Sequence, residues 1–155
     1  MLENASSRMC NMRINAAILV VSGVCLAAAA LNAGQDPAGK TVWNGVYSEA
    51  QAQRGGEKYG RYCASCHGPD LSGADVAPPL AGIEFKSGWN DLSVGDLFER
   101  LQTTMPADKP GTVSRQDNAD IVAFLLAKNG FPAGNAEVPT QTEILKTIKI
   151  LTQKP

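Results

Sequence analysis

Three residues that can form covalent or coordinate bonds lie together at positions 63–67, where the sequence reads CASCH. If this segment is helical, the thiols of Cys63 and Cys66 lie about one helical turn apart and can reach the same edge of a flat ring. The imidazole of His67 can then coordinate a metal at the centre of that ring. Cys-x-x-Cys-His is the attachment signature of a c-type haem. The sequence therefore predicts one haem c, covalently bound through Cys63 and Cys66, with His67 as an axial ligand.

Other kinds of site also use a Cys-x-x-Cys pair. A structural zinc ion needs four ligands, and beyond residue 25 the chain offers only Cys63, Cys66 and His67 as thiol or imidazole donors. A thioredoxin-like redox site is expected within a βαβ pattern, whereas this motif ends a helical stretch that contains several Gln and Glu residues. A pair of surface thiols beside an unrelated histidine is the remaining alternative. Haem attachment is favoured because the chain also offers a second axial ligand.

That second ligand is predicted by elimination. His67 is the only histidine in the chain, so two histidines cannot hold the iron. The other common partner is a methionine thioether, which favours ferrous iron and raises the reduction potential. Three of the four methionines lie within residues 1–33, which leaves Met105. Met105 follows a predicted helix that Pro106 ends, and a side chain at such a junction can point into a pocket.

Composition excludes several classes of function. The chain has 155 residues, enough for one domain, with 14 Lys and Arg against 15 Asp and Glu. The basic residues are scattered, so nothing indicates a nucleic-acid binder. The sequence also offers no second histidine and no nucleophile–base pair for other chemistry. We therefore expect an electron carrier rather than an enzyme.

The first 33 residues are expected to direct export. Residues 14–33 carry no charge and are preceded by Arg8 and Arg13, and Ala28 and Ala30 are placed as in a signal cleavage site. The alternative is an uncleaved membrane anchor, since the uncharged stretch is long enough to span a bilayer. Either interpretation places the domain outside the cytoplasmic membrane. We expect a periplasmic protein that is soluble after cleavage or else anchored facing the periplasm.

The rest of the chain predicts an all-α fold with irregular connections. Helix-starting patterns occur at Ser48, Ser93 and Ser114, each with a Gln or Asp three residues later. The second helix carries an apolar stripe that leads to Met105. Residues 34–45 are interpreted as a linker, residues 68–88 as a long loop and residues 133–155 as a C-terminal extension. The extension contains a short helix and either folds back on the domain or contacts a partner.

Over residues 46–132 the sequence resembles class I c-type cytochromes. It shares their haem motif near the start of the domain, a downstream methionine and a final helix. The resemblance implies three to four helices wrapped around one haem that carries single electrons between Fe(III) and Fe(II). Segments 42–47 and 77–82 are similar to small periplasmic cytochromes that accompany quinone-cofactor dehydrogenases. The implied partners are a dehydrogenase as donor and a cytochrome or oxidase as respiratory acceptor.

The resemblance also implies roles for individual residues. In the family, a proline carbonyl two residues before a leucine accepts a hydrogen bond from the ligand histidine, and Pro78 and Leu80 match this pattern. An ordinary Pro-Pro turn is the alternative. The family's first and last helices cross at a glycine with an aromatic residue one turn later, which Gly55 and Tyr59 match.

Three further questions stay open at the level of sequence. The indole N–H of Trp89 needs a partner if it is buried, and a haem propionate would serve, but packing at the domain edge is the alternative. The protein could be a free shuttle or a dedicated subunit of a larger oxidoreductase. If Met105 does not bind the iron, a haem enzyme or a gas-binding protein becomes the better interpretation.

Overall fold

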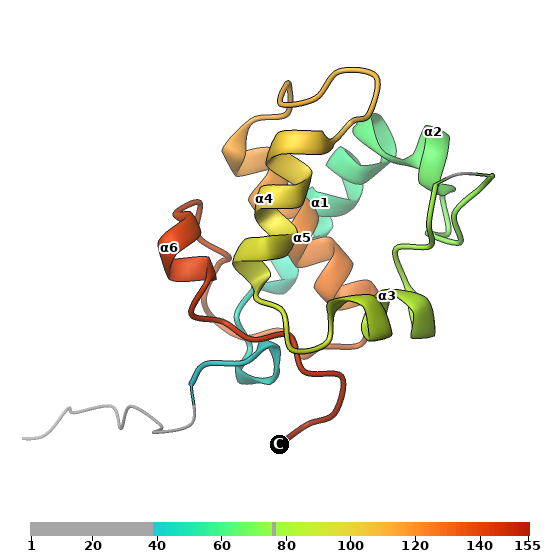
Figure 1. The fold of residues 1–155 in the computed structure, drawn as a ribbon. Helices are drawn as coiled ribbons and strands as arrows, with labels where there is room; N and C mark the ends of the chain where they lie inside the picture. The colour runs from blue at the N-terminus through green and yellow to red at the C-terminus, as the bar shows by residue number, and fades with distance from the viewer. Residues whose placement is uncertain (1–38, 76) are drawn as a thin grey trace, which may run out of the picture. The chain divides into compact units, whose positions relative to one another are not determined.

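The computed structural model describes residues 39–155 with the exception of residue 76, so the predicted leader lies outside the described residues. Helices dominate this part of the chain, which contains isolated β-bridges but no strand (Figure 1). The expected all-α class is therefore confirmed. The elements are η1 (Val42–Asn44), α1 (Glu49–Tyr62), α2 (Ala64–His67), α3 (Gly82–Trp89), α4 (Val94–Thr104), α5 (Arg115–Lys128) and α6 (Thr142–Leu145).

Helices α1 and α5 cross at Gly55, where the backbones come unusually close. A Cβ atom at Gly55 would lie 2.6 Å from the carbonyl carbon of Asp120 and 2.8 Å from the Cβ of Phe124. Only glycine leaves room for this approach. One turn later the rings of Tyr59 and Phe124 pack with their centroids 5.2 Å apart. The expected crossing at Gly55 and Tyr59 is therefore present, and it fixes the direction in which α1 delivers the CASCH segment.

Helix α4 starts at a complete capping box. The Ser93 hydroxyl accepts from the Asp96 amide at 3.0 Å, and the Asp96 carboxylate accepts from the Ser93 amide at 2.8 Å. These bonds satisfy amide groups that the first turn of a helix leaves without partners. The apolar stripe of α4 is buried through Val94, Leu97 and Phe98. The helix packs against α5 on one side and α6 on the other.

Helix α3 corrects the expectation of one long loop over residues 68–88. Its N-cap is Ala81, which offers no side-chain hydrogen bond, and glycines stand at its first and seventh positions. Both features are poor helix signals. The helix forms because tertiary packing stabilises it: Phe85 is buried, and its ring lies 6.2 Å from that of Trp89, measured between centroids.

The described part of the expected linker and the expected C-terminal extension both pack against the domain. Val42 is fully buried, and its amide donates to the Lys149 carbonyl at 2.9 Å. Among residues 133–155, the apolar side chains of Val138, Leu145, Ile148 and Ile150 are all buried. The extension therefore folds back on the domain, and its helix α6 is only four residues long. These segments have too few apolar residues in a regular pattern to show from sequence that they join the core.

None of the described helices combines the length and the apolar character needed to cross a bilayer.

Candidate haem-binding site

The CASCH motif lies where α1 gives way to the short helix α2. Cys63 separates the two helices with φ −124° and ψ −36°, and the amide of His67 donates to the Cys63 carbonyl at 3.0 Å. The hydroxyl of Tyr59 donates to the Gly68 carbonyl at 2.6 Å and so ties the end of the motif back to α1. Burial raises the pKa of Tyr59 to about 12, so its hydroxyl stays protonated. The motif is thus held in one helical turn.

The two thiols of the motif have different surroundings. Cys63 is half-buried, Cys66 is exposed, and neither forms a disulfide with another described residue. Burial, with a smaller contribution from the nearby Cys66, raises the pKa of Cys63 to about 11. A thioredoxin-like site is expected within a βαβ pattern, whereas the described residues around this motif form helices and no strand. The structure thus argues against that alternative.

His67 is buried, with 8% of its surface exposed, and its ring orientation is fixed by one contact. Its Nδ1 lies 2.8 Å from the carbonyl oxygen of Pro78. A carbonyl oxygen can only accept, so Nδ1 carries the proton and the lone pair is on Nε2. The contact expected from the Pro78–Leu80 pattern is therefore present, and the structure leaves Nε2 available as a metal ligand.

A hydrogen-bonded scaffold holds the Pro78 carbonyl in place. The amide of Leu80 donates to the Leu71 carbonyl at 2.9 Å. The side chain of Asn129, the C-cap residue of α5, donates to the Leu80 carbonyl at 3.0 Å and accepts from the Gly82 amide at 3.1 Å. Asn129 is buried and spans both sides of the segment. This role of Asn129 could not be predicted from the sequence, because nothing local shows which distant backbone groups its amide reaches.

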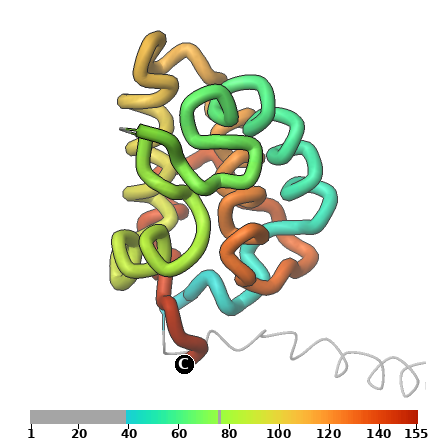
Figure 2. Tube along the Cα trace, turned by 90° about the vertical axis from the view of Figure 1, so that its right-hand side faces the viewer, coloured from blue at the N-terminus to red at the C-terminus, as the bar shows by residue number. Residues whose placement is uncertain are grey.

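Met105 lies directly after α4, as its position before Pro106 predicted. It is the C-cap residue, with extended backbone at φ −121° and ψ 150°, and its side chain is half-buried. Its amide still donates to the Leu101 carbonyl at 3.2 Å. The C-terminal end of α4 and helix α2 lie at the same end of the domain in both views (Figures 1 and 2). Ligation by Met105 stays a prediction.

Leu80 and Trp89 are both half-buried against the core. Trp89 ends α3, where it packs beside Phe85, and Leu80 belongs to the segment that Asn129 holds. Their expected contacts with a haem stay predictions.

The donor set at this end of the domain fits a haem. The described residues contain no group of three or more His, Cys, Asp and Glu side chains that could hold a metal ion by themselves. What they do present is an imidazole of fixed orientation, two thiols one turn apart and a thioether at a helix end. These groups suit a ring that brings its own four nitrogen ligands and needs only two axial ones.

A comparison with protein families points the same way. Residues 50–125 match the protein family described as cytochrome C oxidase, cbb3-type, subunit III. Among solved structures, the chain is similar to the sulfane dehydrogenase SoxCD from Paracoccus pantotrophus, with 21% identity and a TM-score of 0.46. That similarity covers 69% of this chain and 61% of the other. No curated protein matches the chain.

The matched region contains the CASCH motif, Pro78 and Met105. Residues 50–125 thus form a class I c-type cytochrome domain, which implies haem-based electron transfer.

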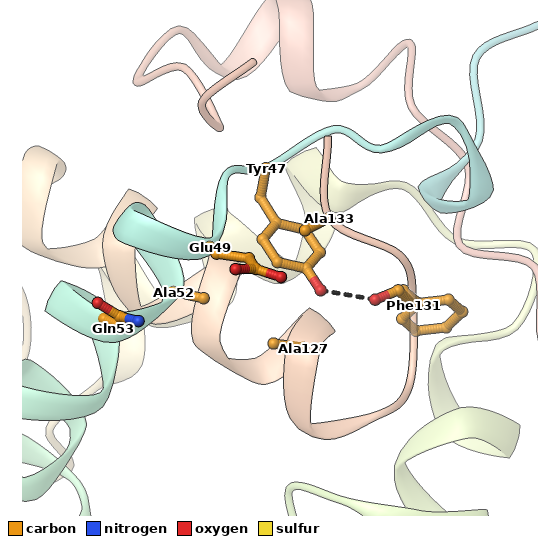
Figure 3. A pocket seen from close by; sticks show the side chains of 7 residues that line it. All are labelled: Tyr47, Glu49, Ala52, Gln53, Ala127, Phe131 and Ala133. Atoms are coloured by element: carbon orange, nitrogen blue, oxygen red, sulfur yellow. Dashed lines mark hydrogen bonds between the residues drawn. The ribbon is translucent and has the colours of Figure 1, made fainter. Parts of the chain in front are cut away.

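A surface pocket of about 390 Å³ lies elsewhere in the domain (Figure 3). It is lined by residues at the start of α1, near the end of α5 and in the segments just before α1 and just after α5, and none of the predicted haem residues contributes to it. Across it, the hydroxyl of Tyr47 donates to the Phe131 carbonyl at 2.6 Å. Burial, helped by the charge of Glu49, raises the pKa of Tyr47, so this bond persists through neutral pH.

Proposed function

We propose that this protein is a periplasmic single-electron carrier. Its one haem c is bound covalently by Cys63 and Cys66, with His67 and Met105 as axial ligands. When bound, the haem supplies a one-electron couple between ferric and ferrous iron. In this proposal the protein takes electrons from a dehydrogenase and passes them to a cytochrome or oxidase.

The contact between His67 and Pro78 is the observation that carries the proposal. A hydrogen bond to a backbone carbonyl fixes the ring tautomer and makes Nε2 a stronger donor. The only histidine of the chain is thus prepared as a ligand, next to two thiols in the attachment pattern. No acid–base partner is needed for such a role, because a coordinated iron that keeps both ligands changes oxidation state without proton transfer at the protein.

The different exposure of the two cysteines also supports a carrier. Cys63 is half-buried and Cys66 is exposed. A group attached to both would therefore have one edge near the surface, where a redox partner can approach, and the rest within the domain.

Covalent attachment is tested by mass. The full-length chain is produced in a host that matures c-type cytochromes, and the purified polypeptide is weighed. We expect the mass of one added haem, and its loss in the Cys63→Ala, Cys66→Ala double variant. A native polypeptide without an added tetrapyrrole would contradict the proposal. The same sample shows whether residues 1–33 are retained, and cell fractionation tests the periplasmic location.

Ligation by Met105 is tested with carbon monoxide, which binds ferrous haem only at an open position. We expect the native ferrous protein to be low-spin and to resist carbon monoxide, because the thioether occupies the sixth position. Met105→Ala should be high-spin and bind it readily. Thr104→Ala is the control, since this neighbouring side chain is exposed and its hydroxyl only donates to the Arg100 carbonyl. Immediate binding by the native protein would favour the gas-binding alternative.

A second candidate is a dedicated subunit of a larger oxidoreductase. The family match favours it, since that family is described as a subunit of an oxidase. Co-purification from the native membrane and sizing of the soluble extract distinguish the two. A monomer with no stable partner would exclude the subunit role.

A further inference from the structure

The residues after the cytochrome motif return to the beginning of α4. The amide of Val94, the first residue of α4, donates to the Ile148 carbonyl at 2.9 Å. The amide of Ile150 donates to the Leu92 carbonyl at 2.8 Å. The first amides of a helix have no partner within the helix, so the Ile148 carbonyl adds to the cap that Ser93 and Asp96 begin. Helix α6 lies beside α4 just before this contact (Figure 1).

Gly95 makes this contact close. A Cβ atom there would lie 2.7 Å from the backbone nitrogen of Lys146 and 3.0 Å from its Cα. A backbone cannot move aside as the end of a side chain can, so any larger residue at position 95 must displace residues 146–150. The Lys146 side chain adds an ion pair to Glu99, one turn further along α4, at 3.2 Å.

The residues that precede this contact in the chain are bonded to α1 and α5. The buried side chain of Gln51 in α1 donates to the Val138 carbonyl at 3.1 Å and accepts from the Val138 amide at 2.7 Å. Arg54, also in α1, pairs with Glu137 at 2.8 Å. The guanidinium of Arg115, the first residue of α5, donates to the Thr140 carbonyl at 3.2 Å. The segment 137–150 is thus fixed to α1 and α5 before it reaches α4.

We propose that residues 137–150 form a brace that holds α4 in position against α1 and α5, and through α4 holds Met105 on the iron. The inference rests on the proposed ligation by Met105. A helix is stiff along its axis, so a change in the placement of its first turn moves the residue that follows its last turn. The brace thereby sets how often the sixth position opens. Gly95 is a positioning residue, because it touches the brace and not the haem.

The test uses the full-length, haem-loaded Gly95→Ala variant. Alanine is the better helix former, so a loss of order reports on the displaced brace and not on α4 itself. We expect hydrogen exchange of the Val94 and Ile150 amides to speed up about tenfold. The rate at which the ferrous protein binds carbon monoxide should rise by a similar factor, and the sulfur-to-iron absorption of the ferric protein should weaken.

Gly60→Ala is the matched control, because Gly60 is an exposed glycine within α1 with no neighbouring atom inside 4 Å of an added Cβ. It should leave both rates unchanged. If Gly95→Ala fails to fold, Ile148→Val removes one buried methyl group from the brace and should raise both rates by a smaller factor. If only one of the two rates, hydrogen exchange or carbon monoxide binding, changes in Gly95→Ala, or if neither does, the brace is contradicted while ligation by Met105 stands. A native protein that binds carbon monoxide at once overturns the Met105 ligation and the brace with it.

Discussion

His67 shows how a single residue of this chain is prepared for its role by the backbone around it. Its Nδ1 contact with Pro78 leaves Nε2 free, and the segment that carries Pro78 depends on bonds made by residues far away in sequence. The motif itself could be predicted from sequence because its three reactive residues are neighbours. The support for that motif could not, since Asn129 acts across a long sequence separation through backbone carbonyls that carry no sequence signature.

Asn129→Ala should weaken this support. The change removes donors to the Leu80 and Leu125 carbonyls in a buried site, which should lower the free energy of unfolding by about 2 kcal/mol. The Nδ1 proton of His67 should also exchange faster with solvent, because the Pro78 carbonyl is held less firmly. NMR of the ferrous protein measures the exchange. Asn135→Ala, at an exposed position, is the control. Unchanged exchange beside reduced stability would show that Asn129 only caps α5.

The helices show which sequence signals predict an element and which do not. Ser48, Ser93 and Ser114 were predicted to start helices, and each is an N-cap whose hydroxyl accepts from the amide three residues later. At Ser48 the predicted partner Gln51 instead uses its side chain to bind Val138. The capping pattern thus predicted the helix start at Ser48 correctly, while a tertiary contact takes up the side chain of Gln51. Helix α3 was missed for the converse reason, since packing forms it without a local cap.

The cap of α4 predicts a dependence of stability on acid. Hydrogen bonds from the backbone and side chain of Ser93 hold the pKa of Asp96 below its ordinary value. A carboxyl with a lowered folded pKa stabilises the protein above its unfolded pKa of about 3.9, and this contribution is lost as the pH falls through the folded value. Ser93→Ala should therefore lower the free energy of unfolding by about 1 kcal/mol at neutral pH. The difference in free energy of unfolding between the native protein and the variant should become smaller below about pH 4.

Unfolding by denaturant at several pH values measures this difference. Ser87→Ala is a suitable control, because Ser87 is exposed and its hydroxyl only donates to the Glu84 carbonyl. If the difference in free energy of unfolding between the native protein and Ser93→Ala stays constant down to pH 3, the assigned role of Asp96 is contradicted.

The domain as a whole includes more of the chain than the cytochrome motif suggested. Val42 and Ile150 are fully buried in the same core, although they belong to segments interpreted from sequence as a linker and an extension. Between them, Lys149 forms bridges to both Thr41 and Ser93. Such isolated bridges involve one residue at a time and leave no periodic pattern, which is why the sequence did not predict them.

Residues 41–150 should accordingly unfold as one cooperative unit. The amides of Val42 and Ile150 are bonded across the domain, so their exchange requires the same opening as the amides of α5. We expect their exchange free energies to agree within about 1 kcal/mol. The amide of the exposed Gln153 should exchange far faster and serves as the internal reference. A lower exchange free energy for Ile150 than for α5 would show that the C-terminal segment opens independently.

The contacts around Lys149 also determine where this cytochrome can be truncated for expression. The family match ends at residue 125, and a fragment designed on those limits would discard Val42, Val138, Ile148 and Ile150 while keeping the apolar surfaces they cover. The Val94 amide would lose its acceptor, and the crowded surface at Gly95 would face water. An expression fragment that preserves the native protein has to begin before Lys40, whose carbonyl accepts from the Lys149 amide, and to extend beyond Thr152, whose amide bonds to Asn90.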